Sequence, residues 1–274
     1  MYITREKTKT GFVYSTKNPV DIERIKKLRI PPMWTSVKID QSDKAKIQAT
    51  GYDIKGRRQY IYHTDWTEKS KKKKFNKMKN FNYDHYSRVI NNFIKKNDLS
   101  RNCVIANVIK IMEDLNIRVG NEMYKKENGS YGITTLLKSH LNGDKLKFIG
   151  KKGIQHTKQI KSDKSLKFIE RVKKIKGPNL FYDNYGKCIT SADLNAFLRN
   201  RVNSNVTCKD IRTYRANQIF LKFMKKVKRG NTEKERKKQI LQGIDYAANE
   251  LGNTRKICKD SYFCLLYTSP SPRD

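Results

Sequence analysis

The sequence predicts an α+β protein, with a small antiparallel β-rich domain over residues 1–80 and a mainly helical domain over residues 81–263. Short alternating runs of apolar and polar residues, separated by turn signals, occupy the first part. Helical periodicity takes over from about Tyr83. A second alternating stretch around residues 150–153 adds one β-hairpin embedded in the helical domain.

The β-rich part is predicted from three runs and the residues that separate them. We expect strands at residues 34–39, 46–52 and 58–62. Residues 53–56 form the turn before the last strand. A helix is expected at residues 19–28, before the Ile-Pro-Pro of residues 30–32, because a residue that precedes proline avoids helical geometry. The basic run at residues 69–79 is expected to be a solvated connector or a strap that faces phosphates.

The helical part carries an apolar stripe, a hairpin and two helix starts. Apolar residues recur at helical spacing from Val104 to Leu115, which predicts a helix with one buried face. Residues 145–160 alternate on both sides of a centre flanked by glycines, which predicts two antiparallel strands joined by a tight turn. An acidic residue follows Thr190 and Thr207 by three positions, a spacing typical of capping boxes.

The charge of the chain indicates a polyanionic partner. Its 274 residues include 61 Lys and Arg against 26 Asp and Glu, so the formal net charge is +35. Solubility of a small domain needs only about 2–8 charges. We therefore expect nucleic acid as the partner, with an anionic membrane surface as the weaker alternative. The first residues lack a signal peptide's apolar stretch, and no apolar run reaches the roughly 18 residues of a membrane span. An intracellular protein without a transmembrane segment is expected.

Motifs for metal binding and for nucleotide hydrolysis are missing from the sequence. The five cysteines form no CxxC pair, and the four histidines form neither an HxxxH pair nor a Cys/His cluster. There is no GxxxxGK[ST] loop. We expect neither a metal nor a cofactor, and the isolated cysteines are typical of a reducing compartment.

The last eleven residues, 264–274, differ in texture from the Lys-rich and Asn-rich chain before them. Two of the six prolines fall within this stretch. A disordered Ser/Pro tail is the simple interpretation. A transposon-type sequencing adapter also translates into these residues, and we expect the stretch to be such an artefact, with the native sequence continuing differently after Phe263.

Four polar segments stand out in the helical part. They are residues 117–122, 148–153, 209–214 and 251–254, the last followed by Tyr262. Taken singly, each has an ordinary explanation, because most Arg and Lys side chains in so basic a chain are solvated charges. A single tyrosine is equally well explained by packing.

Taken together and in this order, the segments resemble the active site of type IB DNA topoisomerases, particularly the small viral and bacterial enzymes. That site consists of Arg, Lys, Arg, His and Tyr in chain order. The resemblance assigns these positions to Arg118, Lys151, Arg212, Asn253 and Tyr262. Lys151 is preferred over Lys152 because it follows Gly150 directly, as in the family pattern. Asn253 stands where most members have His, a variant that some bacterial members share.

The resemblance also implies two DNA-binding stretches. Residues 51–62 are similar to part of the family's DNA-clamping β domain, and residues 124–128 match a DNA-contacting stretch just after the first arginine. The predicted DNA-contacting residues are Arg57, Arg58, Gln59, Tyr60, Tyr62, Tyr124, Lys125, Lys126 and Lys209. Basic side chains would bind phosphates, whereas Gln and Tyr could reach base edges or sugars. Ordinary sheet packing is the alternative explanation for each tyrosine.

The implied reaction is relaxation of supercoiled DNA by transient cleavage of one strand. Tyr262 would attack phosphorus to form a 3′-phosphotyrosine, and Lys151 would protonate the departing 5′-oxygen. Arg118, Arg212 and Asn253 would hold the non-bridging oxygens. One phosphodiester replaces another, so neither ATP nor a metal is required.

Two alternatives remain open from the residues. A tyrosine site-specific recombinase shares the constellation, but usually has His three residues before the second Arg, where this chain has Lys209. The other alternative is an inactive DNA-binding fragment. The expected partner is double-stranded DNA, bound by a monomer. The location would be the host cytoplasm or virion for a viral protein and the nucleoid for a bacterial one; Lys/Ile/Asn-rich usage favours a large DNA virus.

Overall fold

A computed structural model describes residues 2–263 of the chain. The expected adapter-derived stretch, residues 264–274, lies outside the described residues. The chain divides into two compact units, one ending at Lys77 and the other beginning at Met78. Each unit is described by itself. No helix within residues 2–263 is long and apolar enough to cross a membrane.

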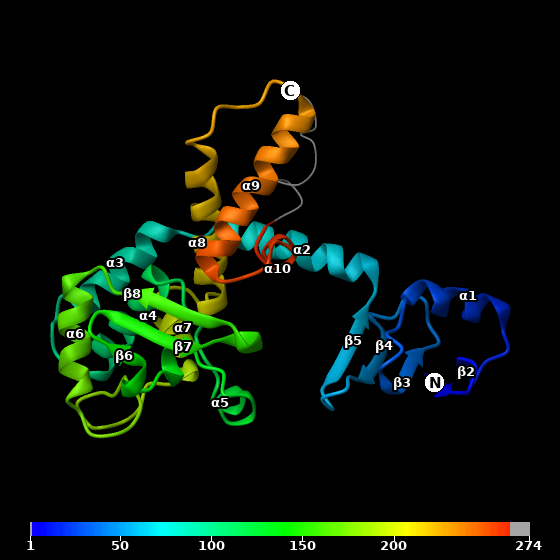
Figure 1. Cartoon of the computed structure of the whole chain (residues 1–274), viewed down its shortest axis with the longest axis horizontal. Helices are drawn as coiled ribbons and strands as arrows, with labels where there is room; N and C mark the ends of the chain where they lie inside the picture. The colour runs from blue at the N-terminus through cyan, green and yellow to red at the C-terminus, as the bar shows by residue number, and fades with distance from the viewer. Residues whose placement is uncertain (1, 264–274) are drawn as a thin grey trace. The chain divides into compact units, whose positions relative to one another are not determined.

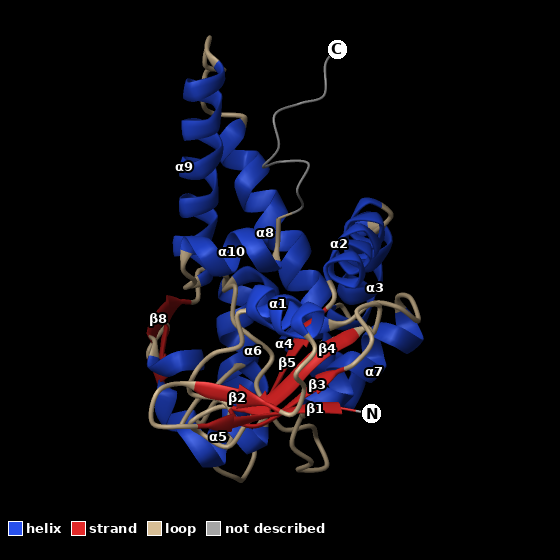
Figure 2. Ribbon diagram, turned by 90° about the vertical axis from the view of Figure 1, so that its right-hand side faces the viewer, coloured by secondary structure: helices blue, strands red, loops and turns tan. Residues whose placement is uncertain are grey.

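The N-terminal unit is built on an antiparallel five-stranded sheet with the order β2-β1-β3-β4-β5. Its elements, coloured by type in Figure 2, are β1 (Tyr2–Lys7), β2 (Phe12–Tyr14), α1 (Pro19–Leu28), β3 (Thr35–Asp40), β4 (Ile47–Tyr52) and β5 (Arg58–Tyr62). The three predicted strands and the predicted helix at residues 19–28 are confirmed. The strands β1 and β2 were not predicted.

One face of this sheet and one side of α1 form a small core. Its buried members are Ile3, Ile25, Val37, Ile39 and Ala49. Successive side chains of a strand point to opposite faces, so alternate residues of β1 and β3 enter the core while their neighbours stay exposed. On β5, the same alternation leaves Tyr60 and Tyr62 exposed on one face, each about 40% accessible.

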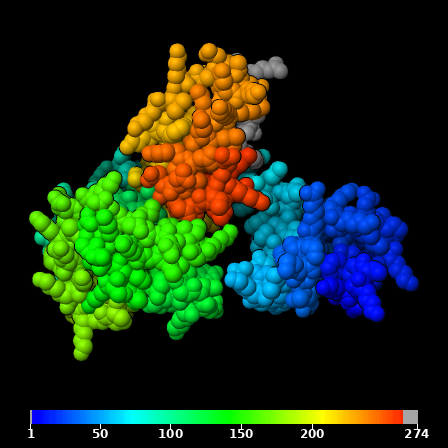
Figure 3. Space-filling model, viewed as in Figure 1, coloured from blue at the N-terminus to red at the C-terminus, as the bar shows by residue number. Residues whose placement is uncertain are grey.

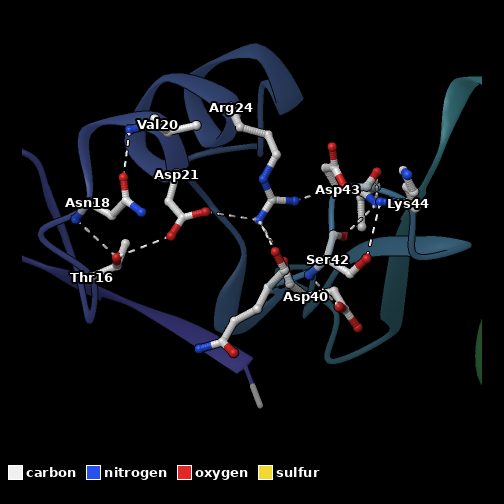
Figure 4. A network of polar contacts seen from close by, with 11 residues as sticks. Thr16, Asn18, Val20, Asp21, Arg24, Asp40, Ser42, Asp43 and Lys44 are labelled. Atoms are coloured by element: carbon white, nitrogen blue, oxygen red, sulfur yellow. Dashed lines mark hydrogen bonds and ion pairs between the residues drawn. The ribbon is translucent and has the colours of Figure 1, made fainter.

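The helix α1 is capped and tied to the sheet by polar contacts (Figure 4). Asn18 accepts a hydrogen bond from the backbone N–H of Val20, the usual arrangement at a helix N-terminus. Arg24 donates to Gln48 Oε1 at 2.8 Å and to the carbonyl of Asp40 at 2.7 Å. These bonds fix the helix over the strand pair β3–β4.

The basic run at residues 69–79 is helical and has no buried residue, and the boundary between the two units falls within it, in agreement with its prediction as a solvated connector. It forms most of α2 (Thr64–Lys79), none of whose residues is buried. Lysine has a high intrinsic helix propensity. Without a buried face, however, the run shows no apolar periodicity by which a helix could be recognised.

The C-terminal unit is mainly helical, as predicted, with one small sheet. Its helices are α3 (Tyr83–Ile94), α4 (Arg101–Asp114), α5 (Glu122–Asn128), α6 (Asp163–Lys173), α7 (Ser191–Arg201), α8 (Cys208–Met224), α9 (Glu233–Leu251) and α10 (Arg255–Ser261). The sheet has the order β6-β7-β8, with β6 (Leu141–Asn142), β7 (Lys145–Ile149) and β8 (Gln155–Gln159). Short 3-10 turns occur at Ile133–Thr135, Lys138–His140 and Lys151–Gly153. The predicted hairpin is the antiparallel pair β7–β8.

The helix α4 is buried almost all round rather than along one stripe. Ten of its fourteen residues are buried, Val104 and Val108 completely. The helices α3, α6, α7 and α8 all contact it. A helix at the centre of a domain needs apolar residues on every side, so the predicted single buried face was too narrow.

Both predicted capping boxes are confirmed. Asp193 accepts hydrogen bonds from the backbone N–H and the hydroxyl of Thr190 at the start of α7, and Asp210 accepts the same two bonds from Thr207 at the start of α8.

The helices α8 and α9 form an antiparallel pair, and α10 crosses the C-terminal end of α9 (Figure 1). A second core cluster lies between them and includes Tyr262 and Phe263. In the space-filling view, the orange and red C-terminal helices are seated on the green hairpin region (Figure 3).

Candidate active site

The tyrosine singled out in the sequence lies directly after α10 and is buried. Its side chain is 6% exposed and belongs to the cluster between α8, α9 and α10. Thr254 caps α10 by accepting from the backbone of Ile257. The Tyr262 hydroxyl accepts a hydrogen bond from Arg212 Nε at 3.0 Å. The ring is thus held in apolar packing, with its oxygen against a guanidinium.

Arg212 lies in the first turns of α8 and is fixed at three points. Besides the tyrosine, it donates to the carbonyl of Leu251 at 2.6 Å and to the carbonyl of Asn116. Its side chain is only 8% exposed. A guanidinium has five donors and keeps its charge, so it can hold these neighbours and still present a cation at the site.

Arg118 and Asn253 meet although 135 positions separate them in the sequence. Arg118 Nη2 donates to Asn253 Oδ1 at 2.6 Å. Arg118 lies in an extended segment whose backbone is bonded to the turn at Ile133, with N···O 2.7 Å. Asn253 follows Gly252, which ends α9 in the left-handed conformation at φ +59°.

This contact determines which way the Asn253 amide faces. Its oxygen accepts from Arg118, so its nitrogen Nδ2 points elsewhere. Nδ2 is buried, makes no hydrogen bond of standard geometry within the described residues 2–263, and lies close enough to the Tyr262 hydroxyl to help lower its pKa. A buried donor without a partner is costly, and such groups concentrate where a ligand completes them. The nitrogen can therefore donate a hydrogen bond to a bound anion.

Lys151 lies at the tip of the β7–β8 hairpin. The backbone N–H of Gly150 donates to the carbonyl of Ile154 at 2.7 Å and closes the turn. Lys152, next in sequence, takes the left-handed conformation at φ +66°. Partial burial lowers the pKa of Lys151, and the nearby charges of Arg118 and Lys152 lower it further. A lysine with a lowered pKa gives up its proton more readily.

The site also shifts the pKa of Tyr262. Burial alone would raise this pKa, because it disfavours the phenolate. The positive charges of Arg212 and Arg118, with the hydrogen bond from Arg212, outweigh burial and bring the pKa below its ordinary value of 10. Four of the five predicted residues thus form two hydrogen-bonded pairs, Arg118 with Asn253 and Arg212 with Tyr262. Lys151 lies near enough for the charges of Arg118 and Tyr262 to affect its pKa.

The predicted DNA-contacting residues of the N-terminal unit lie on and beside β5. Arg57 pairs with Asp53 at 2.7 Å, and Gln59 donates to the same carboxylate at 2.9 Å. Both are therefore partly occupied within the unit. On the opposite face of the strand, the ring of Tyr62 stacks on Tyr60 and on Trp66, and Arg58 lies over Tyr60. Both tyrosines are therefore packed on the sheet surface, in agreement with the alternative explanation, and each still leaves about 40% of its surface exposed.

The predicted contacts of the C-terminal unit lie on α5 and at the start of α8. Tyr124 is 53% exposed. Lys125 approaches Glu122 at 3.4 Å and donates to Asn179 at 3.2 Å. Lys126 and Lys209 are exposed. The residues 2–263 contain no group of three His, Cys, Asp or Glu side chains placed to hold a metal ion.

Sequence reasoning missed two side chains that support the site. Asn217, five residues after Arg212, donates from Nδ2 to the backbone carbonyl of Tyr262 at 3.2 Å. His156, on β8, lies against the glycines that precede Lys151 and Asn253. No sequence signal marks either residue, since their roles depend on elements distant in the chain.

Comparison with known proteins agrees with this geometry. Residues 63–263 match the family described as eukaryotic DNA topoisomerase I, catalytic core, and residues 13–53 match bacterial DNA topoisomerase IB, N-terminal domain. The DNA topoisomerase 1B of Acanthamoeba polyphaga mimivirus is 33% identical over 287 aligned positions, covering 95% of this chain and 84% of the viral protein. That of vaccinia virus (strain Western Reserve) is 29% identical, covering 90% and 81%. The DNA topoisomerase 1 of rabbit fibroma virus is 30% identical, covering 88% and 78%.

The two family matches, which fall on the antiparallel N-terminal sheet and on the helical core, define an enzyme of the DNA topoisomerase class. The chain belongs to the type IB DNA topoisomerases. It is an enzyme that binds DNA and relaxes it, and the family identified from the four sequence segments is confirmed.

Proposed function

We propose that Tyr262 is the nucleophile of DNA relaxation and that Arg118, Lys151, Arg212 and Asn253 complete its active site. The observation that carries this proposal is the 3.0 Å hydrogen bond from Arg212 Nε to the Tyr262 hydroxyl. A cation at this distance favours the phenolate, the form that attacks phosphorus. The same cation lies where charge develops on the phosphate.

In the cleavage step, a bond forms between the Tyr262 oxygen and phosphorus while the bond from phosphorus to the 5′-oxygen breaks. The phenol loses its proton to solvent, and Lys151 donates a proton to the departing 5′-oxygen. The products are a 3′-phosphotyrosine and a free 5′-hydroxyl strand, which can rotate about its intact partner. The reverse step reseals the DNA, and since one phosphodiester replaces another, no ATP and no metal are needed.

Three groups would stabilise the five-coordinate phosphorus. Arg118 and Arg212 present charged donors to its non-bridging oxygens. Asn253 adds a neutral donor, because its buried Nδ2 lies beside the Tyr262 hydroxyl and makes no hydrogen bond of standard geometry within residues 2–263. Such donors are preorganised by the bonds that already hold them, so little reorganisation is needed during the reaction.

The basic and aromatic residues predicted to contact DNA, in each of the two units, would hold the duplex. Tyr60, Tyr62 and Tyr124 offer exposed edges. The exposed charges of Lys126 and Lys209 can bind phosphates directly. Arg57, Arg58 and Lys125 already have partners within the protein, and DNA phosphates would compete for these side chains. We infer that the enzyme acts as a monomer, on the DNA of a host cytoplasm or virion if its source is viral, or of a nucleoid if it is bacterial.

Relaxation of supercoiled plasmid in EDTA and without ATP tests this function. The protein with its native C-terminal sequence should relax positive and negative supercoils alike, and Tyr262→Phe should retain DNA binding but lose relaxation. A requirement for paired recognition sites would indicate a recombinase instead. Binding without relaxation by the unmutated chain would indicate an inactive binding protein.

A further inference from the structure

The imidazole of His156 lies between two glycines, each of which precedes a residue of the proposed site. A Cβ placed on Gly150 would lie 2.5 Å from His156 Nε2, and one placed on Gly252 would lie 2.5 Å from His156 Cε1. Real Cβ atoms essentially never come so close to other heavy atoms. Gly150 is followed by Lys151 and Gly252 by Asn253, so the ring separates the hairpin tip from the end of α9.

The requirement for glycine at position 150 is purely steric. Its φ of −96° is open to any residue, so backbone conformation does not favour glycine there. Gly252 differs, because its φ of +59° favours glycine for conformational reasons as well. The close approach of the imidazole is therefore the structural reason for the small residue before Lys151.

The ring is held from its own strand. His156 pairs with Phe148 across the β7–β8 ladder, and the two rings stack with centroids 5.1 Å apart. Phe148 belongs to the main core of the unit and is 7% exposed. The neighbouring Lys158 donates from Nζ to the carbonyl of Glu250 at 3.0 Å and ties β8 to the end of α9 a second time. The imidazole is thus braced by the core and cannot move aside freely.

Its environment favours the uncharged form of the ring. Burial lowers the pKa of His156, and the positive charges of Lys158, Arg212 and Arg118 lower it further. At neutral pH the side chain therefore fills space without adding a charge beside the two arginines.

We propose that His156 is a positioning residue, a wedge that sets the separation between the Lys151 hairpin tip and the Asn253 loop. The inference rests on the proposed role of Lys151 as general acid. Removing the ring would let the hairpin tip shift relative to the site. A misplacement of about 1 Å can slow a reaction by about 10²-fold.

Single-turnover cleavage of two matched DNA substrates tests the wedge. The first has an ordinary phosphodiester, and the second has a 5′-bridging phosphorothiolate, whose sulfur leaves without needing a proton. His156→Ala should slow cleavage of the first about 10²-fold, and the second should restore most of the rate, as it should for Lys151→Ala. His140→Ala is the matched control, because His140 is also partly buried but packs on Tyr131, at 4.4 Å between centroids. It should stay within a few-fold of the unmutated chain on both substrates.

The results separate the two proposals. Rescue of Lys151→Ala without rescue of His156→Ala overturns the wedge and leaves the general acid in place. Rescue of neither variant overturns the general-acid assignment and the wedge with it. A purely structural loss in His156→Ala would slow both substrates equally, so it cannot imitate the expected result.

A double-mutant cycle tests the contact between His156 and Gly150 by changing the glycine as well as the histidine. Gly150→Ala should slow cleavage because its methyl group meets the imidazole. In the His156→Ala background the collision is gone, so the same substitution should cost little more. Losses that simply multiply would show that the two residues do not interact, and would overturn the wedge.

Discussion

Arg118 donates to the side-chain oxygen of Asn253 at 2.6 Å and thereby turns the amide nitrogen of Asn253 toward the site. The nitrogen is buried beside the Tyr262 hydroxyl and makes no hydrogen bond of standard geometry within residues 2–263. This pairing gives the asparagine a definite orientation at a position where most of the family has histidine. The hydrogen bond acts in both directions: Arg118 fixes the orientation of the Asn253 amide, and the amide oxygen fixes the position of the Arg118 guanidinium.

Asn253→Ala should therefore lose a donor to the phosphate and loosen Arg118. We expect a cost of about 2.7–4 kcal/mol in the cleavage barrier, as for other oxyanion donors. Asn253→His should be tolerated, because histidine can present an N–H donor at the same place. Asn253→Asp keeps the acceptor for Arg118 but has no donor, so it should be as slow as Asn253→Ala or slower. Single-turnover cleavage rates measure the series, and an active aspartate variant would contradict the donor role.

Lys151→Ala should slow cleavage much more than Lys152→Ala. General acids contribute about 10²–10⁴-fold, and only Lys151 follows directly on the glycine against which His156 packs. Lys152 occupies the left-handed turn position beside it and serves as the matched control. Equal losses in the two variants, measured on one ordinary duplex substrate, would remove Lys151 from the proposed role.

The pH dependence of cleavage should report the lowered pKa of Tyr262. The second-order rate constant reflects the free enzyme, so it should rise with pH with an inflection below pH 10 and fall again at higher pH, where Lys151 loses the proton it must donate. Arg118→Ala removes one of the charges that favour the phenolate, so its inflection should move to higher pH. Lys164→Ala, an exposed change on α6, should leave the inflection in place. An inflection that does not move in Arg118→Ala would contradict the electrostatic account.

Replacing Asn217 tests whether its hydrogen bond to the backbone of Tyr262 helps to position the nucleophile. Its Nδ2 donates to the backbone carbonyl of Tyr262 and to that of Thr213, one turn earlier in α8. Asn217→Ala should cost about 1 kcal/mol in the barrier, roughly fivefold in rate, if one hydrogen bond is lost. Asn107→Ala is the control, because Asn107 makes the same bond to its own helix, at Cys103, without touching the site. Equal slowing by both variants would reduce Asn217 to a stabilising residue.

Much of the fold could be predicted because its signals are local. The helix at residues 19–28 has a proline near its start and a Pro-Pro pair after its end, and the strands β3, β4 and β5 alternate clearly. β1 escaped prediction because one of its inward positions is Arg5, whose guanidinium donates to backbone carbonyls at Ile30, Pro31 and Trp34. An inward arginine satisfied by backbone breaks the expected alternation of polar and apolar residues.

The site was predictable to the extent that it follows a family pattern of short segments. That pattern led to Arg118, Lys151, Arg212, Asn253 and Tyr262, and the structure places them in one region of the C-terminal unit. The supporting residues were not predictable, because His156 acts on Gly252 across 96 positions and Asn217 on Tyr262 across 45. Contacts of this kind arise from tertiary packing and leave no periodicity in the sequence.

Tyr262 is proposed to carry the broken strand, and mapping the covalent adduct identifies the residue to which the DNA is joined. DNA would be cleaved by the chain, the reaction stopped with denaturant, and the protein–DNA adduct digested and analysed by mass spectrometry. We expect a single modified peptide with a 3′-linked nucleotide on Tyr262, and no adduct from Tyr262→Phe. A nucleotide on another residue, or a denaturant-resistant adduct from the phenylalanine variant, would contradict it.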